Sequence, residues 1–367
     1  MTSAALATVL MPAVILVPIV VACVLLGMGS WVNRPTVDFV AIATSVAVTA
    51  MEFVLLEASA RGRLVAWLGG WTPHHGSGSV GIVLVGDQFS VGIVLVAGVL
   101  MSCALAFSWR YFEDIHTHYH ALMLMFLAGM TGFALSGGVF NMFVFFNLMG
   151  VAAYALTATK VEDPSAVHGA LNFGIINSLG AYISLMGIGM LYAATGQLNL
   201  AQLSRALATH APDPLAVVGF VSIATGFLVK GAVVPFHFWL DDAHAVAPTP
   251  VCVLFSGIMV ELGIYGVARL YWVGFSGTLE AAQIQRLLMI LGVITALLGG
   301  VMCLLQRHLK RLLAYSTIAH TGLFLLAVGS LSPVALGGIA VYVIGHAAVK
   351  SVLFLSAGII LNRSYAG

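Results

Sequence analysis

Three ionisable residues lie inside long hydrophobic runs of the sequence, where charges are rare. Lys230 and Lys350 are basic, and Glu261 is the acid that accompanies them. An ionised side chain at the centre of a membrane helix costs roughly 2.5–3.5 kcal/mol on insertion scales, and such residues usually face the protein interior and mark an ion path. A lysine in a low-dielectric interior can exchange a proton near neutral pH. The alternative, a side chain that reaches out to the membrane surface, does not fit Lys230, which lies in the middle of its run.

Two histidines extend this set of ionisable groups. His346 precedes Lys350 by four residues, so the two side chains lie on one face of a helix, and His320 lies in the preceding hydrophobic run. Imidazole titrates near pH ~6.5 and can pass a proton between its two nitrogens, although a lone membrane histidine more often serves packing. The pairing with a lysine favours a proton relay. We predict that its members are Lys230, Glu261, His320, His346 and Lys350.

A proline five residues after Lys230 predicts a break in that helix. Pro235 removes a backbone hydrogen bond, and broken helices often form the ion sites of membrane transporters; the alternative is a simple packing kink. Four polar residues follow the break, and they form either the mouth of a half-channel or a group that caps and solvates the membrane interface. They are His237, Asp241, Asp242 and His244.

The elements that position these residues must be membrane helices. Of the 367 residues, 61% are hydrophobic and 7% are charged, against about 25% charged in soluble domains. The net charge of +1 provides no basic footprint for nucleic acid. A span needs about 20 apolar residues, and backbone groups in lipid must be paired internally, so we predict an all-α, polytopic bundle of about eleven transmembrane helices in the cell inner membrane. The predicted helices are 8–28, 36–57, 89–108, 118–136, 138–158, 168–194, 215–238, 250–272, 285–305, 310–331 and 334–362.

No linker or low-complexity segment divides the chain, so we expect a single transmembrane domain over residues 1–367. The longest loop, residues 58–88, contains an alternating stretch at 80–85 that predicts a small hairpin at the membrane surface. A slight excess of Lys and Arg in alternate loops favours an N-terminus outside the cell.

Residue types for redox or hydrolytic chemistry are not grouped in this sequence. The four cysteines lie in apolar runs without metal-ligand spacing. His116, His118 and His120 alternate in a surface loop, where metal binding is the weaker interpretation. We find no catalytic nucleophile and no nucleotide-binding loop. We therefore predict no cofactor, no metal and no catalytic residue in this chain, and we assign any redox chemistry to partner subunits.

Three long motifs carry a resemblance to a known family. They read KGAVVPFHFWL at residues 230–240, LKRLLAYSTIAHTG at 309–322 and GHAAVKSVLF at 345–354. These segments resemble the proton-conducting membrane transporters, which include antiporter-like subunits of respiratory complex I, Mrp-type cation/proton antiporters and membrane subunits of the hydrogenase-4 type. The N-terminal third is similar mainly in hydropathy and in Asp87.

The resemblance implies two inverted five-helix repeats with a discontinuous seventh helix. It places the first repeat at residues 118–272 and part of a second at 285–362, after N-terminal helices in 1–110. Because the family usually has more helices, we expect the second repeat to be incomplete. Lysines along a central hydrophilic axis carry protons in this family, and its members hold no redox cofactor themselves. The resemblance assigns Lys230 as the key lysine of helix seven, with His320, His346 and Lys350 along the axis.

The sequence departs from the family at three polar positions. Asn147 stands where helix five usually carries the glutamate that pairs with the helix-seven lysine, Glu261 stands where helix eight often has lysine or histidine, and Asp241 replaces a proline. We therefore hypothesise that Glu261 has become the charge partner of Lys230.

The favoured function is proton or sodium/proton translocation as one membrane subunit of a respiratory, hydrogenase or antiporter complex. The first alternative is a structural or assembly subunit of such a complex, without ion pumping of its own. The second is a solitary transporter for a small solute, which needs a specific polar pocket that the sequence does not show.

Overall fold

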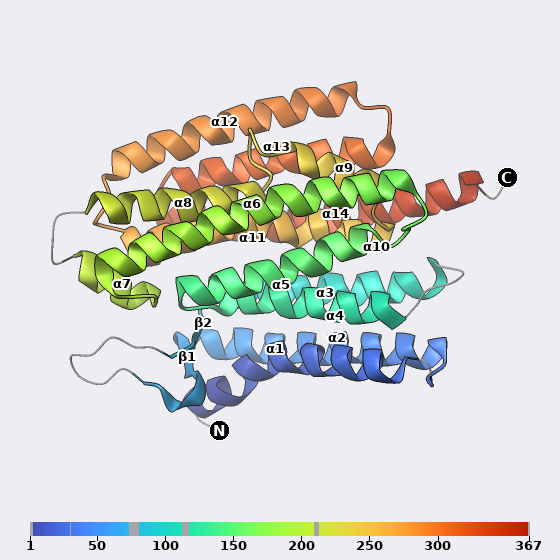
Figure 1. Cartoon of the computed structure of the whole chain (residues 1–367), viewed down its shortest axis with the longest axis horizontal. Helices are drawn as coiled ribbons and strands as arrows, with labels where there is room; N and C mark the ends of the chain where they lie inside the picture. Colours follow the sequence, from blue (N-terminus) through green and yellow to red (C-terminus); the bar gives the residue numbers. More distant parts are fainter. Residues whose placement is uncertain (1–2, 30, 73–80, 112–116, 209–212, 366–367) are drawn as a thin grey trace.

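The computed structural model describes residues 3–29, 31–72, 81–111, 117–208 and 213–365, and most of them are helical. The helices lie side by side in nearly one direction, with α1 and α2 at one edge of the bundle and α12 at the other (Figure 1). Within the described residues, ten segments are long and apolar enough to cross a membrane. The uninterrupted ones are α1 (Ser3–Met28), α2 (Arg34–Ser59), α3 (Gln88–Tyr111), α4 (Thr117–Leu135), α5 (Val139–Thr157), α6 (Pro164–Thr195), α12 (Ala281–Leu305), α13 (Leu309–Gly329) and α14 (Pro333–Tyr365).

The tenth span, Thr249–Phe275, is built from several short helical pieces. It consists of α10 (Thr249–Leu254), a π-helical turn, α11 (Val260–Arg269) and a second π-helical turn. This span is buried from Thr249 to Tyr271. It therefore forms the centre of the bundle, and it carries Glu261.

An asparagine or aspartate cap with a proline one or two residues later starts three of the helices. Asp163 and Asp213 accept hydrogen bonds from the backbone of the first turn of α6 and of α8 (Pro214–Lys230), and Asn33 does the same for α2. Such side chains satisfy amides that have no partner within the helix, and proline suits the first helical position because its missing N–H is not needed there. These short motifs fix where the helices begin at the membrane surface.

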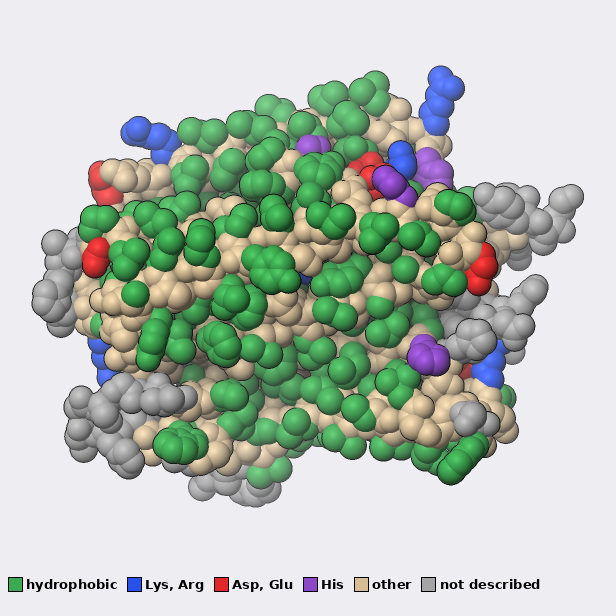
Figure 2. Space-filling model, viewed as in Figure 1, with side chains coloured by type: hydrophobic (Ala, Val, Ile, Leu, Met, Phe, Trp, Pro, Cys, Tyr) green, Lys and Arg blue, Asp and Glu red, His purple; other side chains and the backbone are tan. Residues whose placement is uncertain are grey.

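The outer face of the bundle is covered by large apolar side chains. Figure 2 shows them across the middle of the molecule, with most charged side chains in that view near the two ends of the helices. Leu16, Ile175 and Leu297 are each more than half exposed. A band of this kind is suited to the hydrocarbon of a bilayer. The chain is a multi-pass membrane protein, as the composition predicts.

The helix that begins at Pro214 stops at Lys230, and the chain becomes helical again in α9 (Phe238–Val246). Side chains satisfy backbone groups that the break exposes. The indole Nε1 of Trp239 donates to the carbonyl of Val229 at 3.0 Å, and the amide of Val234 donates to Thr295 Oγ1 at 3.1 Å. Unpaired backbone groups are costly inside a membrane, so these two contacts allow the interruption to exist there. The predicted segment 215–238 is thus shorter as a helix than expected.

The two described strands pair outside the helices. β1 (Leu64–Trp67) is antiparallel to β2 (Val83–Gly86), with Leu64 opposite Gly86. The predicted hairpin within residues 80–85 is wrong in its partner: that stretch supplies one strand, and the second comes from before the 3₁₀ turn at Leu68–Gly70. Residue 80 lies outside the described residues.

Candidate functional site

Lys230 lies at the end of α8, and its side chain is fully buried. The ammonium Nζ lies 4.5 Å from the centroid of the Phe146 ring and 5.7 Å from that of Phe173. Aromatic faces attract a cation, and the attraction is stronger away from water. Lys230 therefore points neither at lipid nor at bulk water but into a cage made by α5 and α6.

No described residue forms a hydrogen bond or an ion pair with the Lys230 ammonium. The hypothesis that Glu261 is its charge partner is wrong, because Glu261 contacts His346 on α14 instead. Asn147 does not fill the role either, since its amide donates to the Phe143 carbonyl of its own helix at 2.8 Å. Sequence position alone did not show that Phe146, the residue before Asn147, is the one that faces the lysine.

Gly150 on α5 lies close to both the Lys230 ammonium and a phenol. A Cβ at this position would lie 3.4 Å from Lys230 Nζ and 3.5 Å from the hydroxyl of Tyr154. The phenol is therefore a polar neighbour of the lysine that sequence reasoning missed. In the sequence, Tyr154 is marked only by its position four residues after Gly150, which is one helical turn along α5.

The Glu261 and His346 side chains meet at the centre of the bundle. Glu261 Oε1 and His346 Nδ1 are 2.7 Å apart, and both side chains are almost fully buried. The atoms are within ion-pair distance, although they are not aligned as a hydrogen bond, and the second oxygen and the second ring nitrogen have no hydrogen-bond partner among the described residues. The contact thus joins α11 to α14 and leaves each group with capacity for another proton partner.

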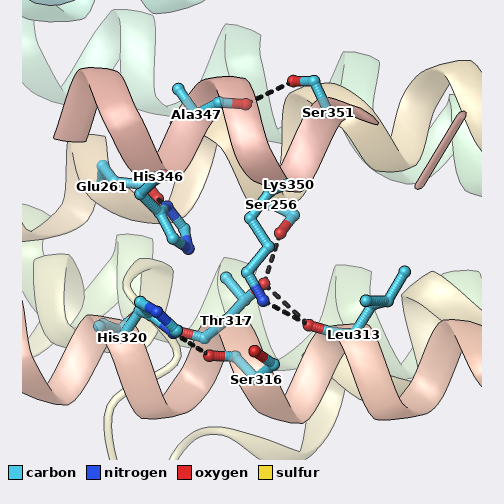
Figure 3. Close-up of polar contacts among 11 residues, drawn as sticks. Ser256, Glu261, Leu313, Ser316, Thr317, His320, His346, Ala347, Lys350 and Ser351 are labelled. Atoms are coloured by element: carbon cyan, nitrogen blue, oxygen red, sulfur yellow. Dashed lines mark hydrogen bonds and ion pairs between the residues drawn. The ribbon is translucent and has the colours of Figure 1, made fainter. Parts of the chain in front are cut away.

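His320 and Lys350 lie on either side of this contact (Figure 3). The rings of His320 and His346 have centroids 4.8 Å apart, and His320 Nδ1 contacts the Ser316 carbonyl at 2.7 Å. The Lys350 ammonium donates to the Leu313 carbonyl at 3.2 Å and is 2% exposed. The structure therefore brings four of the five predicted relay residues together and leaves Lys230 apart from their contacts.

Hydroxyl groups lie between the central helix and α13 in the same region. Ser256 and Thr317 form a short hydrogen bond, and Thr317 also donates to the Leu313 carbonyl that Lys350 uses. Hydroxyls both donate and accept, so this pair extends the polar contacts beyond Lys350 (Figure 3). Neither residue was singled out in the sequence, because single hydroxyls are common in membrane helices.

His244 lies deep in the bundle rather than at a membrane interface. It is fully buried, and its ring stacks on Phe354 with centroids 4.7 Å apart. Lys310 and Lys350 are both close enough to act on it electrostatically. The interpretation of His244 as an interfacial cap is therefore wrong. Lys310 itself is buried and donates to the Ala247 carbonyl at 2.8 Å.

The other polar residues after the break lie nearer to the surface. Asp242 is partly exposed, receives a hydrogen bond from Asn172 at 2.9 Å and pairs with Arg311 at 3.1 Å. Asp241 is buried beside Tyr315, whereas His237 is half-buried at the start of α9 and Pro235 is exposed. Asp242 thus ties α6 and α9 to α13, which is a structural role.

The N-terminal helices contain buried acids that sequence reasoning missed. Asp38 on α2 lies 2.6 Å from His120 Nε2 on α4. Glu52, which is fully buried, accepts a hydrogen bond from Thr131 at 3.3 Å, and its carboxyl packs against Gly98. The signal was present, since both acids lie within the predicted helix at residues 36–57.

Metal ligation has no basis in the described part of the chain, where no group of three or more His, Cys, Asp or Glu side chains converges. Of the alternating histidines, His118 is exposed and His120 contacts Asp38. His116 lies outside the described residues.

Residues 136–366 match the protein-family model described as "NADH:quinone oxidoreductase/Mrp antiporter, TM". The chain belongs to this family. Its relatives include NADH-quinone oxidoreductase subunit N of Desulforudis audaxviator, 33% identical over 80% of this chain, and a probable K⁺/H⁺ antiporter subunit of Rhizobium meliloti, 31% identical over 93% of this chain. The aligned regions cover 58% and 64% of these two relatives. The chain thus spans about 60% of the length of the curated relatives it matches.

Two solved structures share the fold of this chain. A chain in the Mrp complex from Dietzia sp. superposes with a TM-score of 0.87 at 27% identity, covering 96% of this chain and 65% of that one. A chain of the archaeal membrane-bound sulfane sulfur reductase gives the same TM-score at 24% identity, covering 95% and 71%, which shows the fold alone. The all-helical membrane bundle predicted from the sequence is confirmed as Mrp-like.

Proposed function

We propose that this chain conducts protons across a membrane, alone or in exchange for sodium or another monovalent cation, as one subunit of a multisubunit complex. One observation carries the proposal: the buried Glu261–His346 contact lies between a second imidazole and a buried ammonium. Carboxylate, imidazole and ammonium groups all bind and release protons. Ionisable residues held within a membrane mark ion paths by default.

The relay runs through side chains of three helices. A proton passes between Glu261 and His346, with His320 beside the imidazole and Lys350 one helical turn along α14. His244, on which Lys350 and Lys310 both act electrostatically, extends the path towards the start of α13. The first transfer joins two groups that are already in contact, and the remaining steps of the proposed path require bridging water.

Lys230 acts at the other end of the path. Its ammonium is held by aromatic rings instead of a carboxylate, so loss of its proton breaks no ion pair among the described residues. The helix break directly after it exposes backbone groups, an arrangement that membrane proteins tolerate where it lines a cavity or is buried in protein. Pro235 therefore belongs to the proposed site as the cause of the interruption.

The similarity to known proteins supports the proposal that this chain works within a multisubunit membrane complex. The two named relatives are subunits of an NADH-quinone oxidoreductase and of a probable K⁺/H⁺ antiporter. We infer that this chain likewise assembles with other membrane subunits. The inverted repeats at residues 118–272 and 285–362, the second one partial, remain part of the proposal, as do the N-terminal helices within 1–110 as a separate group.

The test measures proton flux in vesicles that contain the chain with the subunits that co-purify with it. Glu261→Gln keeps the shape of the side chain but removes its exchangeable proton, so flux falls at least about tenfold, equivalent to about 1.4 kcal/mol. Glu57→Gln changes an exposed carboxylate on α2 and serves as the matched control, with flux within about twofold of the wild type. Unchanged flux in an assembled Glu261→Gln complex overturns the relay.

A structural role is the second candidate, and the unpaired ammonium of Lys230 favours it. The acid that usually pairs with this lysine in the family is replaced by Asn147, and no described residue substitutes for it. The same experiment separates the two functions, because an assembly subunit retains the flux of its complex in Glu261→Gln.

A further inference from the structure

A cavity of about 680 Å³ opens at one end of the bundle, away from the proposed relay. It lies where α2 ends, α3 begins and α11 ends, at the same end of the helices as β1 and β2 (Figure 1). We call it the arginine cavity, after Arg61, Arg63 and Arg269 in its lining. The ends of these membrane helices place it at the level of lipid headgroups.

The charged lining of the arginine cavity is positive. Asp87 is its one acid among the described lining residues, and it pairs with Arg269. Burial alone would raise the pKa of Asp87, but the Arg269 guanidinium and hydrogen bonds from Ser90 hold it below the usual value. Asp87 is therefore ionised at neutral pH and balances Arg269, which leaves the charges of Arg61 and Arg63 uncompensated within the cavity.

Two buried donors in the lining have no acceptor. Arg269 is 8% exposed, and its Nε has no hydrogen-bond partner among the described residues; the same holds for the indole Nε1 of Trp272. Buried N–H groups are nearly always paired in folded proteins. Both side chains line the cavity, so an acceptor held there satisfies them.

Most of the uncharged lining is apolar and selects an amphipathic ligand. Phe89, Val273 and Leu336 contribute apolar surface to the cavity wall. A free anion leaves such a wall without a partner. A diacyl lipid covers it with its chains and places its phosphate beside the guanidinium groups.

We propose that the arginine cavity binds the headgroup of an anionic phospholipid. Its phosphate oxygens accept hydrogen bonds from Arg61, Arg63, Arg269 Nε and Trp272 Nε1. Guanidinium groups match phosphate geometry through paired hydrogen bonds, and basic pockets between membrane helices recognise anionic headgroups. This site is separate from the relay, and it stands whether or not the chain conducts protons.

The experiment measures binding of phosphatidylglycerol to the purified, delipidated protein with its co-purifying subunits, by native mass spectrometry. The double variant Arg61→Gln/Arg63→Gln is compared with Arg205→Gln/Arg286→Gln, which alters two exposed arginines outside the cavity. We expect the first pair to weaken binding at least about tenfold and the second less than about twofold, because only the first removes partners of the phosphate.

Two further arms decide the nature of the ligand. Trp272→Phe retains the aromatic ring but removes Nε1–H, and we expect about threefold weaker binding, as for one lost hydrogen bond. Phosphatidylcholine and inorganic phosphate are the competing probes, and both should bind at least about tenfold more weakly than phosphatidylglycerol. Equal binding of the two lipids, phosphate binding as tight as lipid binding, or equal effects of the two arginine pairs would each overturn the proposal.

Discussion

Two regions of the molecule each hold a buried contact between a carboxylate and a histidine. In the N-terminal region, Asp38 on α2 and His120 on α4 are 2.6 Å apart. In the centre, Glu261 on α11 and His346 on α14 are 2.7 Å apart. The two contacts are nearly equal in length and burial, so any difference in role must come from their surroundings.

Those surroundings differ in charge and in depth. Asp38 lies in the second turn of α2, and Arg34 on the same helix approaches it at 3.6 Å. Asp38 thus contacts an arginine, whose charge is permanent, as well as the histidine. Glu261 lies near the middle of a buried span, where its neighbours are the titratable side chains of His346 and Lys350. A carboxylate–histidine contact of this length is therefore not enough to indicate a proton relay. The titratable groups next to the contact distinguish a relay from a contact that only holds two helices together.

The largest contrast is expected from replacing the two histidines. His346→Gln should reduce proton flux at least about tenfold, because it removes a group that carries the proton. His120→Gln should leave flux within about twofold and lower the melting temperature, because truncating one partner of a buried contact costs stability. Flux in vesicles and thermal unfolding of the purified protein check the two effects. Loss of flux in a folded His120→Gln protein would remove the distinction between the regions.

A second substitution tests whether the N-terminal region also conducts. Glu52 is fully buried and accepts a hydrogen bond from Thr131. Glutamine keeps that acceptor, so Glu52→Gln should alter flux by less than about twofold and stability by less than about 1 kcal/mol. The flux assay used for His346→Gln measures it, with Glu57→Gln as the exposed control. A loss of fivefold or more (about 1 kcal/mol) would mean that both regions carry protons.

The smallest effect concerns the ion pair that joins the two regions. Asp87 precedes α3 and Arg269 ends α11, and the pair holds the pKa of Asp87 below its usual value. A carboxyl with a lowered pKa in the folded state stabilises the protein above its unfolded pKa of about 3.9, and the contribution is lost as the pH falls through the folded pKa.

Thermal unfolding of Asp87→Asn at several pH values measures this contribution. The variant should melt a few degrees below the wild type at pH 7, and the difference should vanish as the solution becomes strongly acidic. Asp213→Asn is the matched control, since that aspartate caps the exposed start of α8. A difference for Asp87→Asn that stays constant down to low pH would show that the pair contributes packing rather than charge.

The hydropathy of the sequence and its few charged residues predicted which segments are membrane helices and which ionisable residues are buried. Each of the eleven predicted spans contains a helical segment, although 215–238 is helical only as far as Lys230, because a bilayer requires both length and internal hydrogen bonding. The same logic predicted that Lys230 and Lys350 would be buried, and that His346 and Lys350 would share one face. These expectations depend on local sequence and solvent alone.

The contacts between helices were not predictable in this way. Phe146 faces Lys230 and Asn147 does not, yet nothing in the sequence distinguishes one from the other as a neighbour of the ammonium. Glu261 contacts His346 because π-helical turns flank α11 and set which side of the central span it faces. Irregular turns of this kind follow from packing against several helices at once, which a single sequence does not encode locally.

The indole of Trp239 connects the interrupted helix to the aromatic cage. Its nitrogen holds the Val229 carbonyl, and its ring lies flat on Phe173 with centroids 4.4 Å apart, while Phe173 also faces the Lys230 ammonium. A shift of α9 along the bundle therefore displaces the Phe173 ring that stacks on Trp239. The displacement changes the distance between this ring and the Lys230 ammonium, and with it the attraction between them. Movement of the segment after Pro235 is thus transmitted to the Lys230 site through Trp239.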